Sequence, residues 1–311
     1  MSGFASAYHA PVMVEEVMEM LRPERGGLFL DGTLGGGGHA QALLERGADA
    51  RLIGVDRDPD ALAEAGRRLE RFGGRVRLVR SPFADAVEAA GVGEGALHGV
   101  LLDLGISSHQ IDEQARGFTF RPGAPLDMRM AQATAGEPSA ADLLNEMDEA
   151  GLAQVFWRYG EEKRSRMLAR VIGEMRERKP FETSDDLLEA IGRAMPRSDA
   201  ADRARIFQAL RIAVNGEIEQ LETALVKFRD ALAPGGVFAI LSYHSLEDRL
   251  VKNAFRDWSR ACTCPPGLPV CQCGGVPRGE TLARKALTAS PGEIERNVRA
   301  RSARLRGWRH A

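Results

Sequence analysis

Short apolar runs alternate with amphipathic stretches over the first third of the chain. The runs lie at residues 28–30, 51–56, 76–79 and 99–103, and a helical pattern occupies residues 40–46. Runs this short, bounded by turn residues, are typical of buried strands, and their alternation with helices predicts parallel pairing. We therefore predict an α/β fold with a doubly wound, mostly parallel sheet.

The middle of the chain has helical spacing and no strand pattern. Apolar positions recur at helical intervals over residues 139–191, with helix caps expected at Ser139 and Ser184. Further helical blocks follow at residues 206–214 and 215–232, and an apolar run at 237–242 resumes the sheet. This pattern predicts a helical insertion of about 100 residues between two strands, as expected of a chain longer than one typical core.

A glycine-rich turn follows the first apolar run. Residues 31–39 read Asp-Gly-Thr-Leu-Gly-Gly-Gly-Gly-His. Glycine permits positive φ angles and leaves room for a ligand, and the first amides of the next helix face the same space. Taken alone, the run is equally compatible with a merely flexible turn. The acids around it favour a binding site.

Two acids near the turn narrow the choice of ligand. Asp56 ends the second run about 20 residues beyond the glycines, where open α/β sheets place the acid that binds a ribose. Asp31 stands at the end of the first run, where it would repel a pyrophosphate and attract a cation. NAD and S-adenosylmethionine both contain the ribose, and Asp31 favours S-adenosylmethionine with its ammonium and sulfonium groups. His39 is interpreted as either a helix cap or a ligand contact.

The ends of the first four runs are expected to meet at one edge of the sheet. Ligands of doubly wound sheets bind outside the carboxyl ends of the strands, so Asp31, Asp56, Phe83 and Asp103 should converge there. Phe83 is expected either against an adenine ring or in the core beneath a loop. Asp103 is interpreted as a cofactor contact or a catalytic group.

Two polar segments follow strands of the predicted sheet. Residues 105–130 are irregular but contain Phe118 and Phe120 among arginines, so we expect them to form part of an active-site wall. Residues 243–249 place aromatic and imidazole side chains at a strand end, which again indicates the ligand crevice. Ser245 is interpreted as a helix N-cap. No G-x-S-x-G nucleophile elbow is present, which argues against a hydrolase.

Charge is balanced overall but uneven along the chain. The 311 residues include 42 Lys and Arg against 44 Asp and Glu, giving a formal net charge of −2. Residues 278–311 hold nine basic and three acidic residues, a basic C-terminal tail that suits either a solvated edge or RNA. The arginine-rich stretch 163–170 is more often a solvated helix face than an RNA site. Because no apolar run approaches ~20 residues and no signal peptide is evident, we expect a cytoplasmic location.

Four cysteines form two Cys-x-Cys pairs, Cys262 with Cys264 and Cys271 with Cys273. A structural disulfide is not expected in a cytoplasmic protein. Paired thiolates suggest zinc, but the spacing is tighter than the usual two-residue knuckle, so reduced loop cysteines are the alternative. The sequence leaves the metal question open.

Nine sequence blocks occur in order along the chain. They are DGTLGGGGH (31–39), GVDRDPDAL (54–62), LLDLGISSHQID (101–112), RGFTF (116–120), PLDMRM (125–130), YGEEK (159–163), FQALRIAVN (207–215), SYHSLEDRLVK (242–252) and RARSARLR (299–306). Together they resemble the family of ribosomal RNA small-subunit methyltransferase H. They cover nearly the whole chain and are far more specific than the glycine turn alone.

The resemblance implies an S-adenosylmethionine-dependent methyltransferase of the Rossmann type with an inserted helical substrate-recognition domain. The methyltransferase core would comprise residues 1–108 and 214–311, and the insertion residues 109–213. The implied reaction methylates N4 of a cytidine in 16S ribosomal RNA, with the small ribosomal subunit as partner. The cofactor contacts that it implies are Gly37, Gly38, His39, Asp56, Phe83, Asp103 and Gln110.

Two departures from the family pattern are visible. Residues 199–205 stand where relatives have a histidine and a proline, which affects contacts within the insertion, and Tyr243 stands where phenylalanine is common. Neither departure falls on one of the expected cofactor residues.

The exocyclic amine of cytosine is a poor nucleophile because its lone pair is delocalised into the ring. We expect Asp103, or the backbone carbonyls of residues 104–106, to accept its hydrogens, with proximity and electrostatics supplying most of the rate and no covalent enzyme intermediate. The sequence also admits three rival functions: an RNA-binding module without catalysis, a dehydrogenase, and a methyltransferase for DNA or small molecules.

Overall fold

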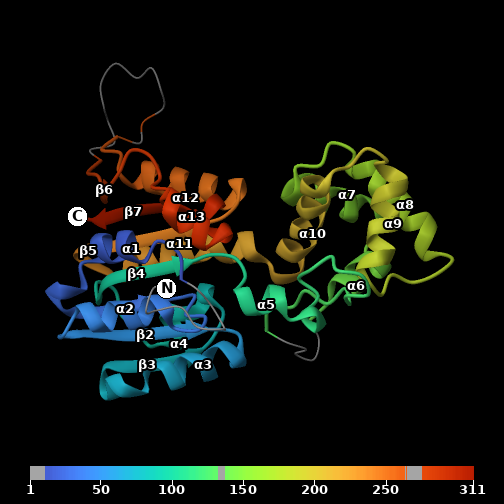
Figure 1. The fold of residues 1–311 in the computed structure, drawn as a ribbon. Coiled ribbons are helices and arrows are strands. Elements are labelled where there is room, and N and C mark those ends of the chain that lie inside the picture. Colours follow the sequence, from blue (N-terminus) through green and yellow to red (C-terminus); the bar gives the residue numbers. More distant parts are fainter. Residues whose placement is uncertain (1–10, 132–136, 263, 265–274) are drawn as a thin grey trace. The chain divides into compact units, whose positions relative to one another are not determined.

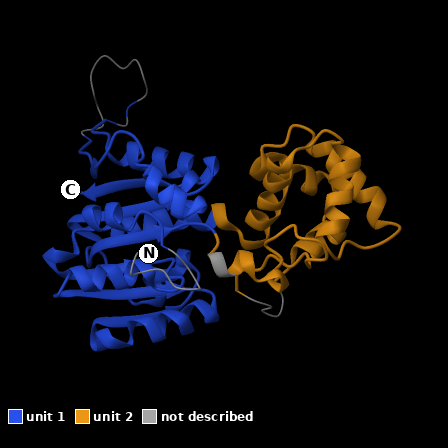
Figure 2. Ribbon diagram, in the orientation of Figure 1, with its two compact units in different colours: residues 1–105, 219–311 blue, residues 106–218 orange. Residues whose placement is uncertain are grey.

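The chain forms two compact units. The computed structural model describes residues 11–131, 137–262, 264 and 275–311. Residues 1–105 and 219–311 make up the first unit, called here the sheet unit, and residues 106–218 the second, the helical unit (Figure 2). The sequence placed the boundaries at 108/109 and 213/214. In the structure they fall at 105/106 and 218/219, the second in the first turn of the helix Glu217–Ala231.

A seven-stranded sheet organises the sheet unit (Figure 1). Its strands are β1 (Gly27–Asp31), β2 (Ala50–Asp56), β3 (Val76–Arg80), β4 (Leu97–Asp103), β5 (Leu232–Ser242), β6 (Gly279–Thr281) and β7 (Arg304–His310). The order is β3-β2-β1-β4-β5-β7-β6, with β1 to β5 parallel and β7 antiparallel to both of its neighbours. The predicted α/β fold is confirmed.

Alternate strand residues bury into opposite layers. In β5, Ala239 and Leu241 join one apolar cluster, whereas Phe238 and Ile240 join the other. The first cluster includes residues of α1 (Val14–Leu21), α2 (Gly38–Arg46) and α3 (Pro59–Leu69). The second includes residues of α4 (Ala86–Ala89), α11 (Glu217–Ala231) and α12 (Ser245–Trp258). A parallel sheet buried on both sides in this way explains why its strands read as continuous apolar runs.

The C-terminal segment is a strand rather than the basic tail that the sequence predicted. In β7, Leu305 buries in one apolar layer and Trp308 in the other, both at 0% exposure. Arg306 donates two hydrogen bonds to the Asp248 carboxylate, and Arg309 pairs with Glu280. The segment is rich in arginine, but two of its positive charges are paired with carboxylates of the sheet unit.

Trp308 completes an aromatic cluster between β7 and α12. Its ring meets Trp258 edge to face at 5.2 Å between centroids and stacks on Phe255 at 6.3 Å. Its indole Nε1 donates to the Ser259 hydroxyl at 3.2 Å. The contacts of one buried tryptophan therefore attach the last strand to its covering helix.

The helical unit has a core of its own. Its helices are α5 (Ser108–Asp112), α6 (Ala140–Glu146), α7 (Glu149–Gly160), α8 (Ser165–Arg176), α9 (Ser184–Ala194) and α10 (Ala200–Asn215). Ser139 caps α6 as predicted, but Thr183 rather than Ser184 caps α9. The capping box there pairs the Thr183 hydroxyl and amide with Asp186, and Ser184 is the buried first residue of the helix.

The irregular segment after β4 belongs to the helical unit. Arg129 is paired with Asp127 at 2.6 Å, and Arg116 donates to the carbonyl oxygen of Met130 at 2.8 Å. These two arginines stabilise the segment through contacts within it. Its expected role as an active-site wall stays a prediction.

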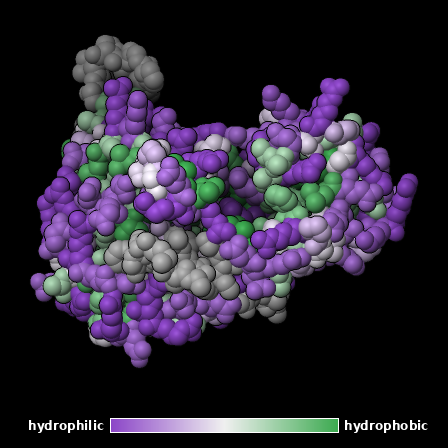
Figure 3. All heavy atoms as spheres, viewed as in Figure 1, coloured by the Kyte–Doolittle hydropathy of each residue, from purple (hydrophilic) through white to green (hydrophobic). Residues whose placement is uncertain are grey.

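The described part of the chain contains no helix that is both long enough and apolar enough to cross a membrane. Hydrophilic residues make up most of the visible surface of each unit (Figure 3).

Replacing Trp308 with alanine should destabilise the sheet unit by about 3–5 kcal/mol, because it empties a fully buried site and removes ring contacts on two sides. Trp157, which is 60% exposed, offers the matched control, and Trp157→Ala should cost less than about 0.5 kcal/mol. Urea unfolding followed by circular dichroism measures both. Equal effects of the two substitutions would contradict the assigned role of β7.

Candidate active site

The glycine-rich turn connects β1 to α2 at the carboxyl edge of the sheet. Gly35 and Gly37 have φ angles of 51° and 76°, in the left-handed region that favours glycine. Gly38 begins α2, and a Cβ there would lie 2.8 Å from the Pro11 side chain. Both backbone shape and close packing therefore require glycine in the turn.

Asp31 ends β1 beneath this turn and is only 2% exposed. One carboxylate oxygen accepts from the Thr33 amide at 3.1 Å. Burial raises the pKa of Asp31 to about 7, and the negative charges of Asp103 and Asp56 push it in the same direction. A buried acid of this kind gains most from a cation placed beside it.

Asp56 ends β2 and holds the glycine turn from the other side. Its two carboxylate oxygens accept from the amides of Gly35 at 2.8 Å and Asp58 at 2.9 Å. Burial raises the pKa of Asp56 to about 6, against the lowering effect of these amides. The side chain is thus fixed at the position where open α/β sheets bind a ribose.

Asp103 ends β4, and its carboxylate lies between two ring side chains. The Tyr243 hydroxyl donates to Oδ1 at 2.7 Å, and Oδ2 lies 3.7 Å from Nδ1 of His39. The Asp103 amide donates to the Thr33 hydroxyl at 2.6 Å, which joins β4 to the glycine turn. Burial, followed by the charge of Asp103, raises the pKa of Tyr243 well above its usual value, so the phenol stays a donor.

The three carboxylates converge as the sequence predicted, because β1 lies between β2 and β4 in a parallel sheet. Together with the bare backbone of the glycine turn they form a site suited to a cationic ligand. A pyrophosphate would meet three carboxylates there.

His39 and Phe83 lie in the sheet unit with the three acids. His39 is 4% exposed, and its Nε2 lies 2.8 Å from the Val12 carbonyl oxygen. A carbonyl oxygen only accepts, so Nε2 carries a proton, and Nδ1 is the ring nitrogen that faces the Asp103 carboxylate. Phe83 is half-buried and packs against the second apolar layer, which fits its core interpretation and leaves an adenine contact as a prediction.

Gln110 belongs to the helical unit. Its side-chain oxygen accepts from the Ser107 amide at 3.0 Å, and the Ser107 hydroxyl accepts from the Gln110 amide at 3.2 Å. This reciprocal pair orders the start of α5. Its expected cofactor contact stays a prediction.

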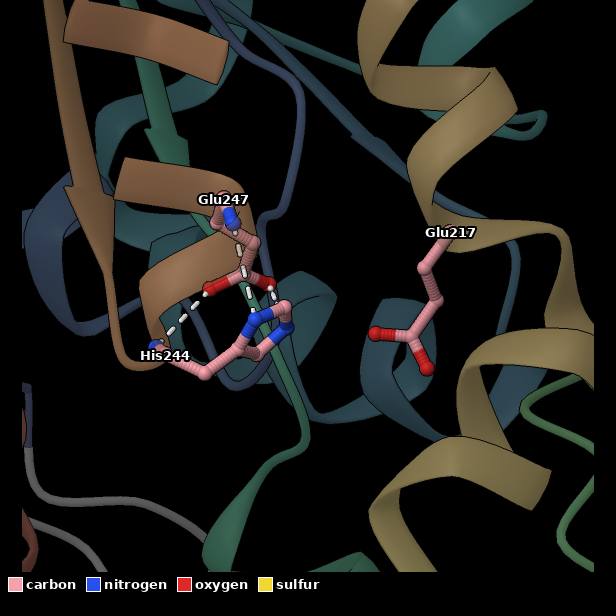
Figure 4. Close-up of side chains that lie close together, drawn as sticks. All are labelled: Glu217, His244 and Glu247. Atoms are coloured by element: carbon pink, nitrogen blue, oxygen red, sulfur yellow. Dashed lines mark hydrogen bonds and ion pairs between the residues drawn. The ribbon is translucent and has the colours of Figure 1, made fainter. Parts of the chain in front are cut away.

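Glu247 fixes the turn that presents Tyr243. Its buried carboxylate accepts from the Tyr243 amide at 2.9 Å, and its Oε1 lies 3.0 Å from the His244 ring (Figure 4). His244, rather than Ser245 as predicted, is the N-cap of α12, because its ring accepts from the Glu247 amide. Glu217, also drawn in Figure 4, belongs to the helical unit, where it pairs with Arg211.

The sequence placed the segment 243–249 at the ligand crevice but assigned no individual role to Thr33, Tyr243 or Glu247. Tyr243 had a visible signal, as a polar ring at a strand end where phenylalanine is common. Thr33 had none beyond its position inside the glycine turn.

The cysteine hypothesis falls largely outside the described residues. Cys262 is exposed and Cys264 half-buried, whereas Cys271 and Cys273 are not described. Zinc binding stays a prediction.

The sequence profile of the MraW methylase family matches residues 6–311. This chain belongs to the MraW methylase family. A relative from Gemmatimonas aurantiaca, named ribosomal RNA small subunit methyltransferase H, is 53% identical over all of this chain and 98% of its own length. A relative of the same name from Heliobacterium mobile is 48% identical over 96% of this chain and 97% of its own.

For this MraW methylase, Tyr243→Phe should lower the free energy of unfolding by about 1–3 kcal/mol, because it leaves a buried Asp103 oxygen without its donor. Urea unfolding at neutral pH gives the loss. The same substitution made in an Asp103→Ala background should cost almost nothing, since the acceptor is already gone. Equal losses in both backgrounds would show that the hydrogen bond does not matter.

Proposed function

We propose that this protein transfers a methyl group from S-adenosylmethionine to the N4 amine of a cytidine in 16S ribosomal RNA. The convergence of Asp31, Asp56 and Asp103 around the glycine turn carries the proposal, because it forms a buried anionic site at the ligand-binding edge of the sheet. Membership of a methylase family supplies the reaction class, and the relatives named for small-subunit ribosomal RNA supply the substrate.

The residues of the site fit S-adenosylmethionine. Asp56 is placed to accept from ribose hydroxyls, and the tight backbone turn through Gly37 and Gly38 lies beside it. Asp31 and Asp103 offer negative charge to an ammonium or sulfonium group. When bound, this cofactor supplies an electrophilic methyl group. NAD, the cofactor of the rival dehydrogenase hypothesis, would bring a pyrophosphate against the same acids.

Asp103 is proposed to act on the acceptor amine. Its carboxylate stands at the strand end between two rings, because Oδ2 lies 3.7 Å from Nδ1 of His39 and the Tyr243 hydroxyl donates to Oδ1. A carboxylate held in this way accepts a hydrogen of the amine and favours a nitrogen lone pair directed at the methyl group. The proton then leaves through the carboxylate, and no covalent bond to the enzyme forms.

Affinity for S-adenosylmethionine should increase about tenfold between pH 6 and pH 7, about fivefold from the ionisation of Asp31 and nearly twofold from that of Asp56. The raised pKa of Asp31, about 7, means that the free protein binds a proton there that a cationic ligand expels. Affinity therefore rises with pH as Asp31 ionises, and below pH 7 binding releases protons. Isothermal titration in two buffers of different ionisation enthalpy measures both quantities.

Asp31→Asn serves as the control for this pH dependence. The variant keeps the side-chain shape and should retain less than about a twofold change over the same interval, the part due to Asp56 with its pKa of about 6. If the pH dependence of cofactor affinity were unchanged in the variant, Asp31 would not be part of the cation site.

Asp103→Asn should lower kcat by about 100-fold or more, because an amide is a far weaker proton acceptor than a carboxylate. Single-turnover methyl transfer at saturating cofactor measures this step, and the cofactor Kd is determined separately. Wild-type turnover with unchanged cofactor affinity would refute the assignment. A loss of cofactor affinity alone would make Asp103 a cofactor contact only.

The position of the methyl group tests the proposed function directly. Small subunits or 16S RNA lacking the modification are incubated with the full chain and labelled cofactor, and the nucleosides are identified by mass spectrometry. N4-methylcytidine is the expected product. Methylation at carbon, on another base or on DNA would contradict the proposal, and no transfer at all would favour the RNA-binding module.

A further inference from the structure

We propose that a basic groove on the helical unit binds the phosphate backbone of the RNA substrate. The groove is a hollow of about 590 Å³. Its lining residues are Lys163, Arg164, Arg166, Met167, Arg170 and Ala194. The inference rests on the proposed function for its choice of RNA, and it assigns a surface that the cofactor site does not include.

The start of α8 turns these cations outward. Leu168 and Ile172 bury in the core of the helical unit, so the opposite side of the helix, with Arg166 and Arg170, faces solvent. Before the helix, the buried Glu162 carboxylate accepts from the Arg164 amide at 2.7 Å and fixes the turn. The cations therefore project from an ordered backbone, which lowers the entropy lost on binding.

The charges in the groove are largely uncompensated. Lys163 and Arg166 form no ion pair with the described residues. Arg170 lies 3.6 Å from Glu174, but both side chains are more than half exposed, and such pairs are weak. Arg164 interacts electrostatically with Asp202, whose carboxylate already pairs with Arg205. Four cations thus face one hollow with little local neutralisation.

Such a groove fits a polyanion better than a single small anion. Arg166 and Arg170 are one helical turn apart, about 6 Å along the axis, so several cations contact successive negative groups of a chain. Arginine binds phosphate through its planar fork, and lysine does so as a point charge. Met167, 43% exposed among the cations, offers an apolar contact to a sugar or base.

The test uses the full chain carrying Lys163→Gln and Arg166→Gln together. Affinity for 16S ribosomal RNA is measured between 50 and 200 mM salt, and the double variant should bind about 5–20-fold more weakly at the low end. The slope of log K against log salt should fall by about 1–2, since two phosphate contacts are lost. Cofactor affinity and the circular dichroism spectrum should not change.

Arg193→Gln is the matched control. Arg193 lies on α9 in the same unit, is exposed, and is already paired with Glu189. Its replacement should leave both RNA affinity and salt slope within experimental error. The charge-preserving variant Arg166→Lys should keep most of the salt slope.

Unchanged RNA affinity and salt slope in the double variant would overturn the proposal. Failure of the wild-type chain to bind RNA would also overturn it. So would a double variant that still bound RNA but no longer bound an acidic ribosomal protein, because the groove would then bind protein. Because this readout is binding, it is separate from the methylation test. Weakened RNA binding together with absent methyl transfer by every variant would support the groove and refute the proposed function.

Discussion

Desolvation of three carboxylates at one edge of the sheet is the constraint on which the site depends. Parallel pairing of β1 with β2 and β4 brings Asp31, Asp56 and Asp103 together, and desolvation there raises the pKa of Asp31 and Asp56. Each acid is tolerated only because a donor is supplied to it: the Thr33 amide, the Gly35 amide and the Tyr243 hydroxyl. The glycine turn and the residue that follows β5 therefore both supply hydrogen-bond donors to these carboxylates.

Much of this arrangement was predictable from local sequence. Short apolar runs predicted the first four strands. Parallel strands present their carboxyl ends at one edge of a sheet, and this rule predicted that Asp31, Asp56 and Asp103 lie close together. Those predictions succeeded because each depends on a pattern within a few residues and on one general topological rule.

The features that escaped prediction depend on partners far away in sequence. Tyr243 contacts Asp103 across 140 residues, and no local pattern indicates which side chain completes such a pair. In β7 the residues that bury in opposite layers, Leu305 and Trp308, are separated by arginine and glycine, so the segment resembles a charged tail. Serine is the more usual helix cap, but His244 caps α12 because the capping box pairs Glu247 with His244 and not with Ser245.

The position of the helical unit within the chain has a consequence for synthesis. β4 ends at Asp103, but its neighbour β5 begins only at Leu232, after the whole helical unit has been made. At ordinary translation rates that interval lasts roughly ten seconds, during which β4 is an unpaired apolar edge. The helical unit is continuous in sequence and has its own core, so its residues are complete before the sheet gains its last three strands.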